Sequence, residues 1–110
     1  TTSIAQNGIQ WTGGSGRIEG STMTGIWWIG TPWTSTGVLP YDAGGPIVVR
    51  GNTFVDCQTG VYWIDTAVAS IDLLVEGNSF THTSAVDQNG YDAIDVWTAD
   101  SAAGSWIVRD

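Results

Sequence analysis

Two short sequence patterns recur in alternation along this chain of 110 residues. The first pattern reads RIEGSTM (17–23), VVRGNTF (48–54) and LVEGNSF (74–80), and it begins again as IVRD (107–110). The second pattern reads GIQW (8–11), GVLPYD (37–42), GVYWID (60–65) and AIDVW (93–97). Because the patterns stay constant while the spacing between copies varies, they predict stacked strands joined by loops of different lengths.

Stacked strands place equivalent residues of successive repeats about 4.8 Å apart, so like side chains form rows. From the first pattern, the row expected inside the fold is Met23, Phe54 and Phe80. From the second pattern, it is Ile9, Val38, Val61 and Ile94. Asn52 and Asn78 follow a turn glycine, where asparagine tolerates left-handed geometry and can bond its copy one coil away, so both are predicted to be structural.

These patterns resemble the right-handed parallel β-helix repeats of the pectate-lyase-like superfamily of carbohydrate-binding proteins and sugar hydrolases. The resemblance carried by V-x-G-N-x-F followed by G-V-x-φ covers nearly the whole chain. It implies an all-β fold, a right-handed parallel β-helix (β-solenoid) of about four coils, formed by residues 1–110 as a single domain. The family's functions are diverse, including lyases, hydrolases, epimerases, adhesins and phage tailspikes, so the resemblance is specific for fold and not for function.

Charge alternates at the position before the turn glycine, which reads Glu19, Arg50, Glu76 and Arg109 in successive repeats. Only 13% of the residues are charged, so four alternating charges at one position are improbable by chance. Adjacent opposite charges on stacked strands contribute little energy when exposed, but they fix the register.

The chain starts just before a second pattern and stops within a first pattern. Joined end to start, VRD and TTSIAQNGIQW align with VRGNTFVDCQTGVYW (49–63) across a one-residue gap. The ends show no capping element, so we expect an uncapped module that stacks head to tail or continues within a longer protein. The residues predicted to make this contact are Glu19, Arg109, Asp110, Thr1 and Thr2. The alternative is a fragment whose caps have been removed.

A net charge of −8, with three arginines and no lysine, excludes a basic footprint for nucleic acid and disfavours anionic membranes. No run of 18 apolar residues is present, so no membrane insertion is expected. The surplus of aspartate and the lack of lysine suit a secreted or cell-surface protein. The single cysteine, Cys57, cannot form an internal disulfide and is expected to be a small buried residue.

Two further groups are candidates for chemistry or binding. Asp42 and Asp65 lie five residues after Gly37 and Gly60, so they are expected to be neighbours that could hold a calcium ion. The resemblance adds that polysaccharide lyases of this fold hold Ca²⁺ with acidic residues on stacked strands, and that some hydrolases use paired aspartates. However, no lysine is present, and two of the three arginines belong to the charge row.

The long insertion after Gly25 carries Trp27, Trp28 and Trp33, whose rings could stack on sugars or pack the loop onto the strands. His82 is the only histidine, and no nucleophile can be assigned to it. We therefore expect a non-enzymatic extracellular structural module that associates with itself and needs no cofactor, calcium excepted. The alternatives are a carbohydrate-binding module that uses the tryptophans, and a fragment of a calcium-dependent polysaccharide lyase or hydrolase.

Overall fold

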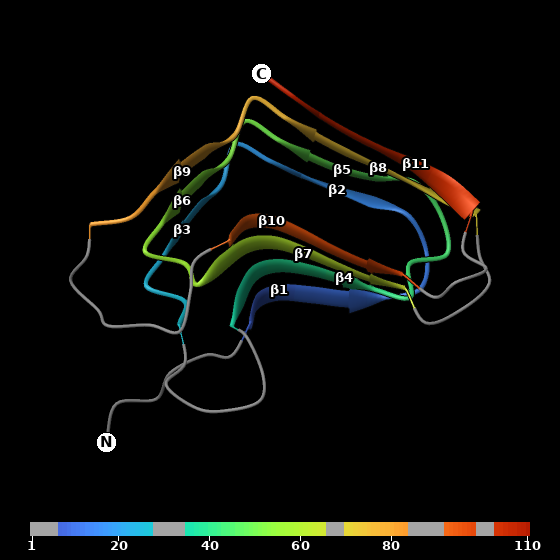
Figure 1. Ribbon diagram of the computed structural model, residues 1–110, viewed down its shortest axis with the longest axis horizontal. Helices are drawn as coiled ribbons and strands as arrows, with labels where there is room; N and C mark the ends of the chain where they lie inside the picture. The colour runs from blue at the N-terminus through green and yellow to red at the C-terminus, as the bar shows by residue number, and fades with distance from the viewer. Residues whose placement is uncertain (1–6, 28–34, 66–69, 84–91, 99–102) are drawn as a thin grey trace.

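The structure is a computed structural model that describes residues 7–27, 35–65, 70–83, 92–98 and 103–110 (Figure 1). Every regular element in these residues is a β-strand, and the strands form three parallel sheets. Sheet A contains β1 (Asn7–Thr12), β4 (Thr36–Tyr41), β7 (Thr59–Asp65) and β10 (Asp92–Thr98). Sheet B contains β2 (Gly16–Glu19), β5 (Ile47–Arg50), β8 (Ser70–Glu76) and β11 (Ala103–Arg109). Sheet C contains β3 (Thr22–Thr24), β6 (Thr53–Val55) and β9 (Ser79–Thr81).

The chain visits the sheets in a fixed order, A then B then C. It does so three times, and a fourth passage contributes β10 and β11. We call each passage a layer, so the first layer is β1 to β3 and the fourth is β10 with β11. The three sheets surround a common interior (Figure 1). This all-β arrangement of parallel strands is compatible with a β-helix-like fold.

The interior is built from rows of equivalent side chains, as the repeat predicts. Val38 and Val61 are partners in sheet A and are fully buried. In sheet B, Val49 pairs with Val75, and their exposed fractions are 0% and 2%. In sheet C, Met23, Phe54 and Phe80 are successive partners, which confirms the row predicted from the first pattern.

The rings of Phe54 and Phe80 stack with centroids 4.9 Å apart and planes 6° apart. This stack has room because glycine stands opposite each ring. A Cβ at Gly37 would lie 2.8 Å from the Phe54 ring, and a Cβ at Gly60 would overlap the Phe80 ring. The next residue in this glycine row is Ala93, since Val61 pairs with Ile94 and Thr59 with Asp92.

The turns between sheets B and C depend on backbone that glycine tolerates. Gly20, Gly51 and Gly77 have φ near +60° (61°, 62° and 60°), the left-handed region that a Cβ disfavours. Their N–H groups donate to the layer above, from Gly20 to the Arg50 carbonyl at 3.2 Å and from Gly51 to the Glu76 carbonyl at 2.9 Å. The glycine of the first pattern therefore fixes one corner of the fold in each of the first three layers.

Candidate functional site

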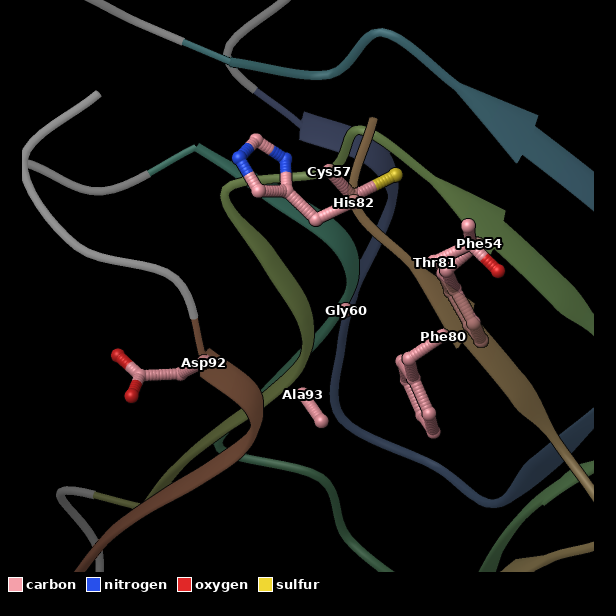
Figure 2. A pocket seen from close by; sticks show the side chains of 8 residues that line it. All are labelled: Phe54, Cys57, Gly60, Phe80, Thr81, His82, Asp92 and Ala93. Atoms are coloured by element: carbon pink, nitrogen blue, oxygen red, sulfur yellow. The ribbon is translucent and has the colours of Figure 1, made fainter. Parts of the chain in front are cut away.

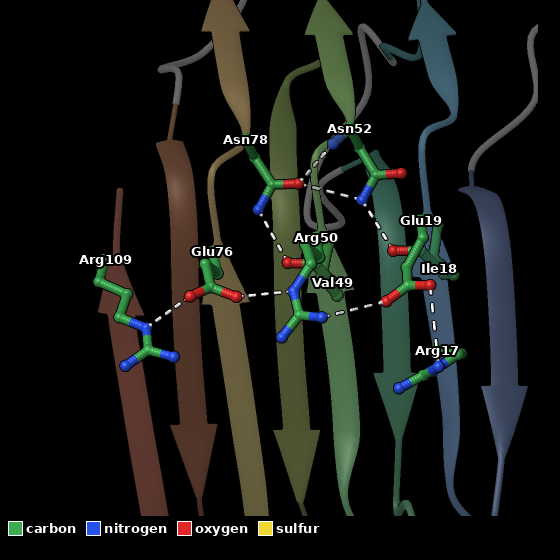
Figure 3. A network of polar contacts seen from close by, with 9 residues as sticks. All are labelled: Arg17, Ile18, Glu19, Val49, Arg50, Asn52, Glu76, Asn78 and Arg109. Carbon is green, nitrogen blue, oxygen red and sulfur yellow. Dashed lines mark hydrogen bonds and ion pairs between the residues drawn. The ribbon is translucent and has the colours of Figure 1, made fainter.

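The alternating charges form a continuous row along the outer face of sheet B (Figure 3). Arg50 Nε donates to Glu76 Oε2 at 2.6 Å, and its Nη1 lies 3.6 Å from Glu19 Oε1. Arg109 Nε donates to Glu76 Oε1 at 2.8 Å. The predicted alternation is thus confirmed, and each step of the row pairs opposite charges.

The row has different charges at its two ends. Glu76 is held between two guanidinium groups, and the hydrogen bond from Arg50 is the main cause that lowers its pKa, with Arg109 adding to it. Glu19 ends the row at the first layer, with Arg17 beside it at 3.9 Å. Arg109 ends the row at the fourth layer, with 58% of its side chain exposed. The charge row therefore ends on a carboxylate at the first layer, with the Arg17 guanidinium group beside it, and on a guanidinium group at the fourth layer.

A second row, of asparagine side chains, lies at the turn between sheets B and C (Figure 3). Asn52 Oδ1 accepts the Ser21 backbone N–H at 2.9 Å, and its Nδ2 donates to the Ile18 carbonyl at 2.9 Å. One layer up, Asn78 Oδ1 accepts the Asn52 backbone N–H at 2.9 Å, and its Nδ2 donates to the Val49 carbonyl at 2.9 Å. The structural role predicted for both asparagines is confirmed.

The inner rows of sheet B become exposed at the fourth layer. Val108 is the partner of Val75, and Trp106 is the partner of Leu73. Val75 and Leu73 are 2% and 1% exposed, whereas Val108 and Trp106 are 59% and 47% exposed. The sequence analysis did not predict that Trp106 and Val108 face inward. The alternation of inner and outer positions around Arg109 nevertheless places both on the inner face. We call the fourth-layer end, with Trp106, Val108 and Arg109, the open end.

Two adjoining hollows lie at the open end above β9. One has a volume of about 190 Å³ and is lined by Phe80, Thr81, His82 and Ala93 among others (Figure 2). The other has a volume of about 390 Å³, and its lining includes Asn78, Phe80, Ala93 and Val108. Sheets A and B each have a fourth strand, whereas sheet C has three among the described residues. The hollows therefore follow the position that a fourth strand of sheet C would take.

The residues at the end of β9 form a small polar cluster. Asp56 Oδ1 accepts the Thr83 backbone N–H at 2.6 Å, and its Oδ2 accepts the Thr83 hydroxyl at 2.7 Å. These bonds, chiefly the hydroxyl bond, lower the pKa of Asp56. His82 Nδ1 lies 3.3 Å from the same carboxylate. This cluster holds Thr83, after the end of β9, against Asp56, and no spacing in the sequence predicts it.

Cys57 lines the smaller hollow with His82 but is not arranged as a nucleophile. The thiol is free and buried, and it contacts the Met23 carbonyl oxygen at 3.6 Å. Burial raises the pKa of the Cys57 thiol, so the reactive thiolate is disfavoured. A packing role explains these contacts.

The other predicted site residues are placed only in part. Asp42 follows Tyr41, the partner of Ile64, so its backbone neighbours that of Asp65; the Asp65 side chain is outside the described structure. Trp27 is half-buried, while Trp28, Trp33, Thr1 and Thr2 lie outside the described residues. Asp110 is exposed beside the open end. Within the described ranges, no three His, Cys, Asp or Glu side chains gather as a metal site, and calcium binding stays a prediction.

The fold and the site together define an all-β protein. Its parallel strands form three sheets, and its open end exposes apolar side chains. Comparison with protein-family models, with curated proteins and with solved structures found no match. In the part of the chain that the structure describes, no helix is long and apolar enough to cross a membrane.

Proposed function

We propose that this chain is a non-enzymatic structural module of the right-handed parallel β-helix type, with about four coils, whose copies stack head to tail outside the cell. The observation that carries the proposal is the exposure of Val108 above the buried Val75. A further layer on β10 and β11 would bury this inner row, and apolar burial is the main favourable term in association. The occupant we assign to the open end is a second copy of this chain.

Charge complementarity supports a second copy as the occupant. In a stack that continues the register of sheet B, β2 of the second copy follows β11, so Glu19 of that copy meets Arg109. The alternation of acid and base at this position of the repeat then continues across the junction, and Arg17 lies beside Glu19 on the same face. Exposed pairs of this kind are worth little each, and their main effect is to set the register.

Shape complementarity points to the same stack. Trp106, Leu73, Ile47 and Gly16 are successive positions of one inner row, so Trp106 would face Gly16 of the second copy. Beside Gly16 lies a hollow of about 350 Å³ that is also lined by Ile9 and Ile18. The largest side chain of the open end therefore lies in register with an empty space at the opposite end.

One residue requires a local adjustment in this stack. A Cβ at Gly60 would lie 2.6 Å from the carbonyl oxygen of Ala93 in the layer above. Ala93 itself has a Cβ, so a strand placed over β10 must lie slightly farther away at this point than β10 lies from β7. The adjustment is confined to one residue of sheet A.

Two neighbouring substitutions on β11 test the proposal. Val108 faces the interior and Ile107 faces outward, yet both are exposed, by 59% and 48%. In sedimentation velocity over a range of concentrations, the chain and Ile107→Asp should both form larger species, whereas Val108→Asp should stay monomeric. Circular dichroism of both variants checks that each is folded. Loss of association in Ile107→Asp alone would indicate side-by-side contact, and a monomeric unmodified chain would refute stacking.

A second candidate function, carbohydrate binding, is favoured by Trp97. This residue is 50% exposed on the outer face of sheet A. Asp95, two residues earlier, shares that face and pairs with Tyr62 of β7. Exposed aromatic rings beside hydrogen-bonding groups suit sugar rings, and the charge of −8 favours neutral over acidic glycans. Loss of a polysaccharide-induced fluorescence change in Trp97→Ala, retained in Trp106→Ala, would support this candidate; no change in the unmodified chain would reject it.

A further inference from the structure

The outer face of sheet B carries an apolar stripe beside the charge row. The stripe consists of Val48, Leu74 and Ile107, which are partners in β5, β8 and β11 and alternate with the inward-facing residues of these strands. Ile107 is 48% exposed, and the other two are half-buried. Sheets A and C lie on the inner side of sheet B, so none of the described strands covers the stripe (Figure 1).

We propose that this face is an interface with a second copy of the chain, which joins two stacks side by side and in opposite directions. The inference rests on the proposed stacking. A two-fold axis along the strands, between the second and third layers, generates the pair. With this axis each row faces the same row of the second copy with the layers in reverse order, so the second layer faces the third and the first faces the fourth.

The charge row is complementary to itself in this arrangement. From the first layer to the fourth it reads Glu19, Arg50, Glu76 and Arg109. In reverse order it reads base, acid, base, acid, so Arg50 faces Glu76 of the second copy and Glu19 faces Arg109. The row lies at the margin of the face, next to the turn glycines, and exposed pairs there add little energy but select the orientation.

The shape of the face is also complementary to itself. Val48 faces Leu74 of the second copy, and Ile107 faces Arg17. Beside Arg17 and Val48 lies a hollow of about 290 Å³. Its lining is completed by Ser15, Gly16 and Pro46. The most exposed side chain of the stripe therefore lies opposite a space that can receive it.

Pairing of stacks that run in the same direction is disfavoured by charge. Asp72 and Glu76 lie two residues before and after Leu74 in β8, so both carboxylates are on the outer face. A two-fold axis parallel to the stack would place Glu76 against Asp72 of the second copy, and such like charges across an interface are unfavourable. In the opposite-direction pair Asp72 faces Pro46 instead, because Ile47 is the partner of Leu73.

The face of one copy is too small to hold a pair by itself. Three rows of alternate residues cover about 20 Å along the strands, and four layers cover about 19 Å, so the face measures roughly 400 Å². Stable interfaces bury about 800 Å² on each partner. Stacks of three or more copies exceed this area, so we expect pairing to follow stacking and to be absent from the monomeric Val108→Asp chain.

The test is the mass per length of the filaments, measured by scanning transmission electron microscopy. One copy of 11.7 kDa in every 19 Å or so gives about 6 kDa per nanometre for a single stack and about twice that for a pair. The unmodified chain should show the higher value. Val48→Asp should halve it, because the carboxylate then faces Leu74 of the second copy. Within its own chain this carboxylate lies beside Arg17 and Arg50, which limits the cost to folding.

A matched control comes from the outer face of sheet C. Val55 is also a half-buried valine of the second layer, so Val55→Asp should keep the higher mass per length. Leu74→Lys is the second disrupting variant, since Asp72 and Glu76 flank the new charge in its own strand, and it should halve the value as well. Circular dichroism checks that each variant is folded.

Ile107→Asp tests the orientation of the two stacks. In opposite-direction pairs the new carboxylate meets Arg17 of the second copy, so the pairs should remain. In same-direction pairs Ile107 faces itself, so two carboxylates would meet and the pairs would separate. A halved mass per length in Ile107→Asp would therefore overturn the proposed orientation.

The possible failures are distinct. If the unmodified chain forms filaments of about 6 kDa per nanometre, the pairing is wrong and the stack stands. If pairs persist in both Val48→Asp and Leu74→Lys, the outer face of sheet B is not the contact. If the unmodified chain stays monomeric, the proposed function and the pairing both fail. Contacts of Glu19 with Arg109 between stacked copies are measured in the Val48→Asp chain, which removes the second contact of these residues across the pair.

Discussion

Val108 lies directly over Val75 in sheet B, yet Val75 is 2% exposed and Val108 is 59% exposed. The two residues are the same type at the same position of the repeat. Among the described residues a further layer covers Val75 and none covers Val108, and we propose that a second copy supplies the missing layer.

The ends of the charge row predict an electrostatic coupling between copies. Arg109→Glu should weaken association by placing a carboxylate against Glu19 of the neighbouring copy, and Glu19→Arg should weaken it likewise. The double variant should associate better than the sum of the single effects predicts, by about 0.5 to 1 kcal/mol. Each single variant also disturbs pairs within its own chain, at Glu76 or at Arg50. These contributions cancel in the coupling free energy of the double-mutant cycle, which compares the double variant with the two single variants. A coupling free energy of zero would exclude the Arg109–Glu19 contact.

The register of Trp106 with Gly16 predicts a steric effect. Gly16→Leu should fill the hollow beside Ile18 and weaken association about tenfold or more, while the monomer keeps its stability. Trp106→Ala in the same chain should recover part of this loss, because the smaller residue no longer competes for the space. Sedimentation equilibrium measures both effects. Additive losses in the double variant would show that the two residues do not meet.

The asparagine row predicts unequal costs at its two members. Asn52 is 1% exposed, and its removal leaves the Ser21 N–H and the Ile18 carbonyl without their side-chain partner. Asn52→Ala should therefore lower the free energy of unfolding by about 2 to 4 kcal/mol. Asn78 is half-buried at the open end, so Asn78→Ala should cost about half as much. Urea unfolding of the monomeric Val108→Asp chain measures both, and equal costs would contradict the burial argument.

The lowered pKa of Glu76 predicts a loss of stability in acid. A carboxyl group whose pKa is lower in the folded chain stabilises the fold above its ordinary pKa of 4.5 and ceases to do so as the pH falls through the folded value. The unfolding midpoint should therefore fall as the pH drops below about 4.5, and it should fall less steeply in Glu76→Gln. Asp56 titrates in the same direction in both chains, so the difference between them isolates Glu76. Parallel profiles would contradict this account of the charge row.

The rows could be predicted from the sequence because they depend on register alone. Phe54 and Phe80 share the same local pattern, as do Arg50 and Glu76, so counting from the turn glycine was enough to pair them. The contact of Asp56 with Thr83 could not be predicted in this way. It joins residues after two strand ends, where the repeat no longer fixes the spacing.

The exposure of apolar side chains at the open end could not be predicted from the sequence either. Trp106 occupies an inner position like Leu73, and only the absence of a layer above it among the described residues makes it accessible. The tryptophans that stand out in the sequence are those of the insertion after Gly25, of which Trp27 is half-buried. A pattern of residues identifies faces and rows, whereas the place where a stack of strands stops depends on tertiary structure.

The most direct test of head-to-tail stacking is electron microscopy of the concentrated chain with measurement of the axial repeat. Four layers at about 4.8 Å each predict filaments with a subunit rise of about 19 Å, and a layer line at about 4.8 Å from strands perpendicular to the axis. These filaments should be absent from Val108→Asp and present in Ile107→Asp. Particles of monomer size at all concentrations, or filaments without the 4.8 Å layer line, would contradict the proposed assembly.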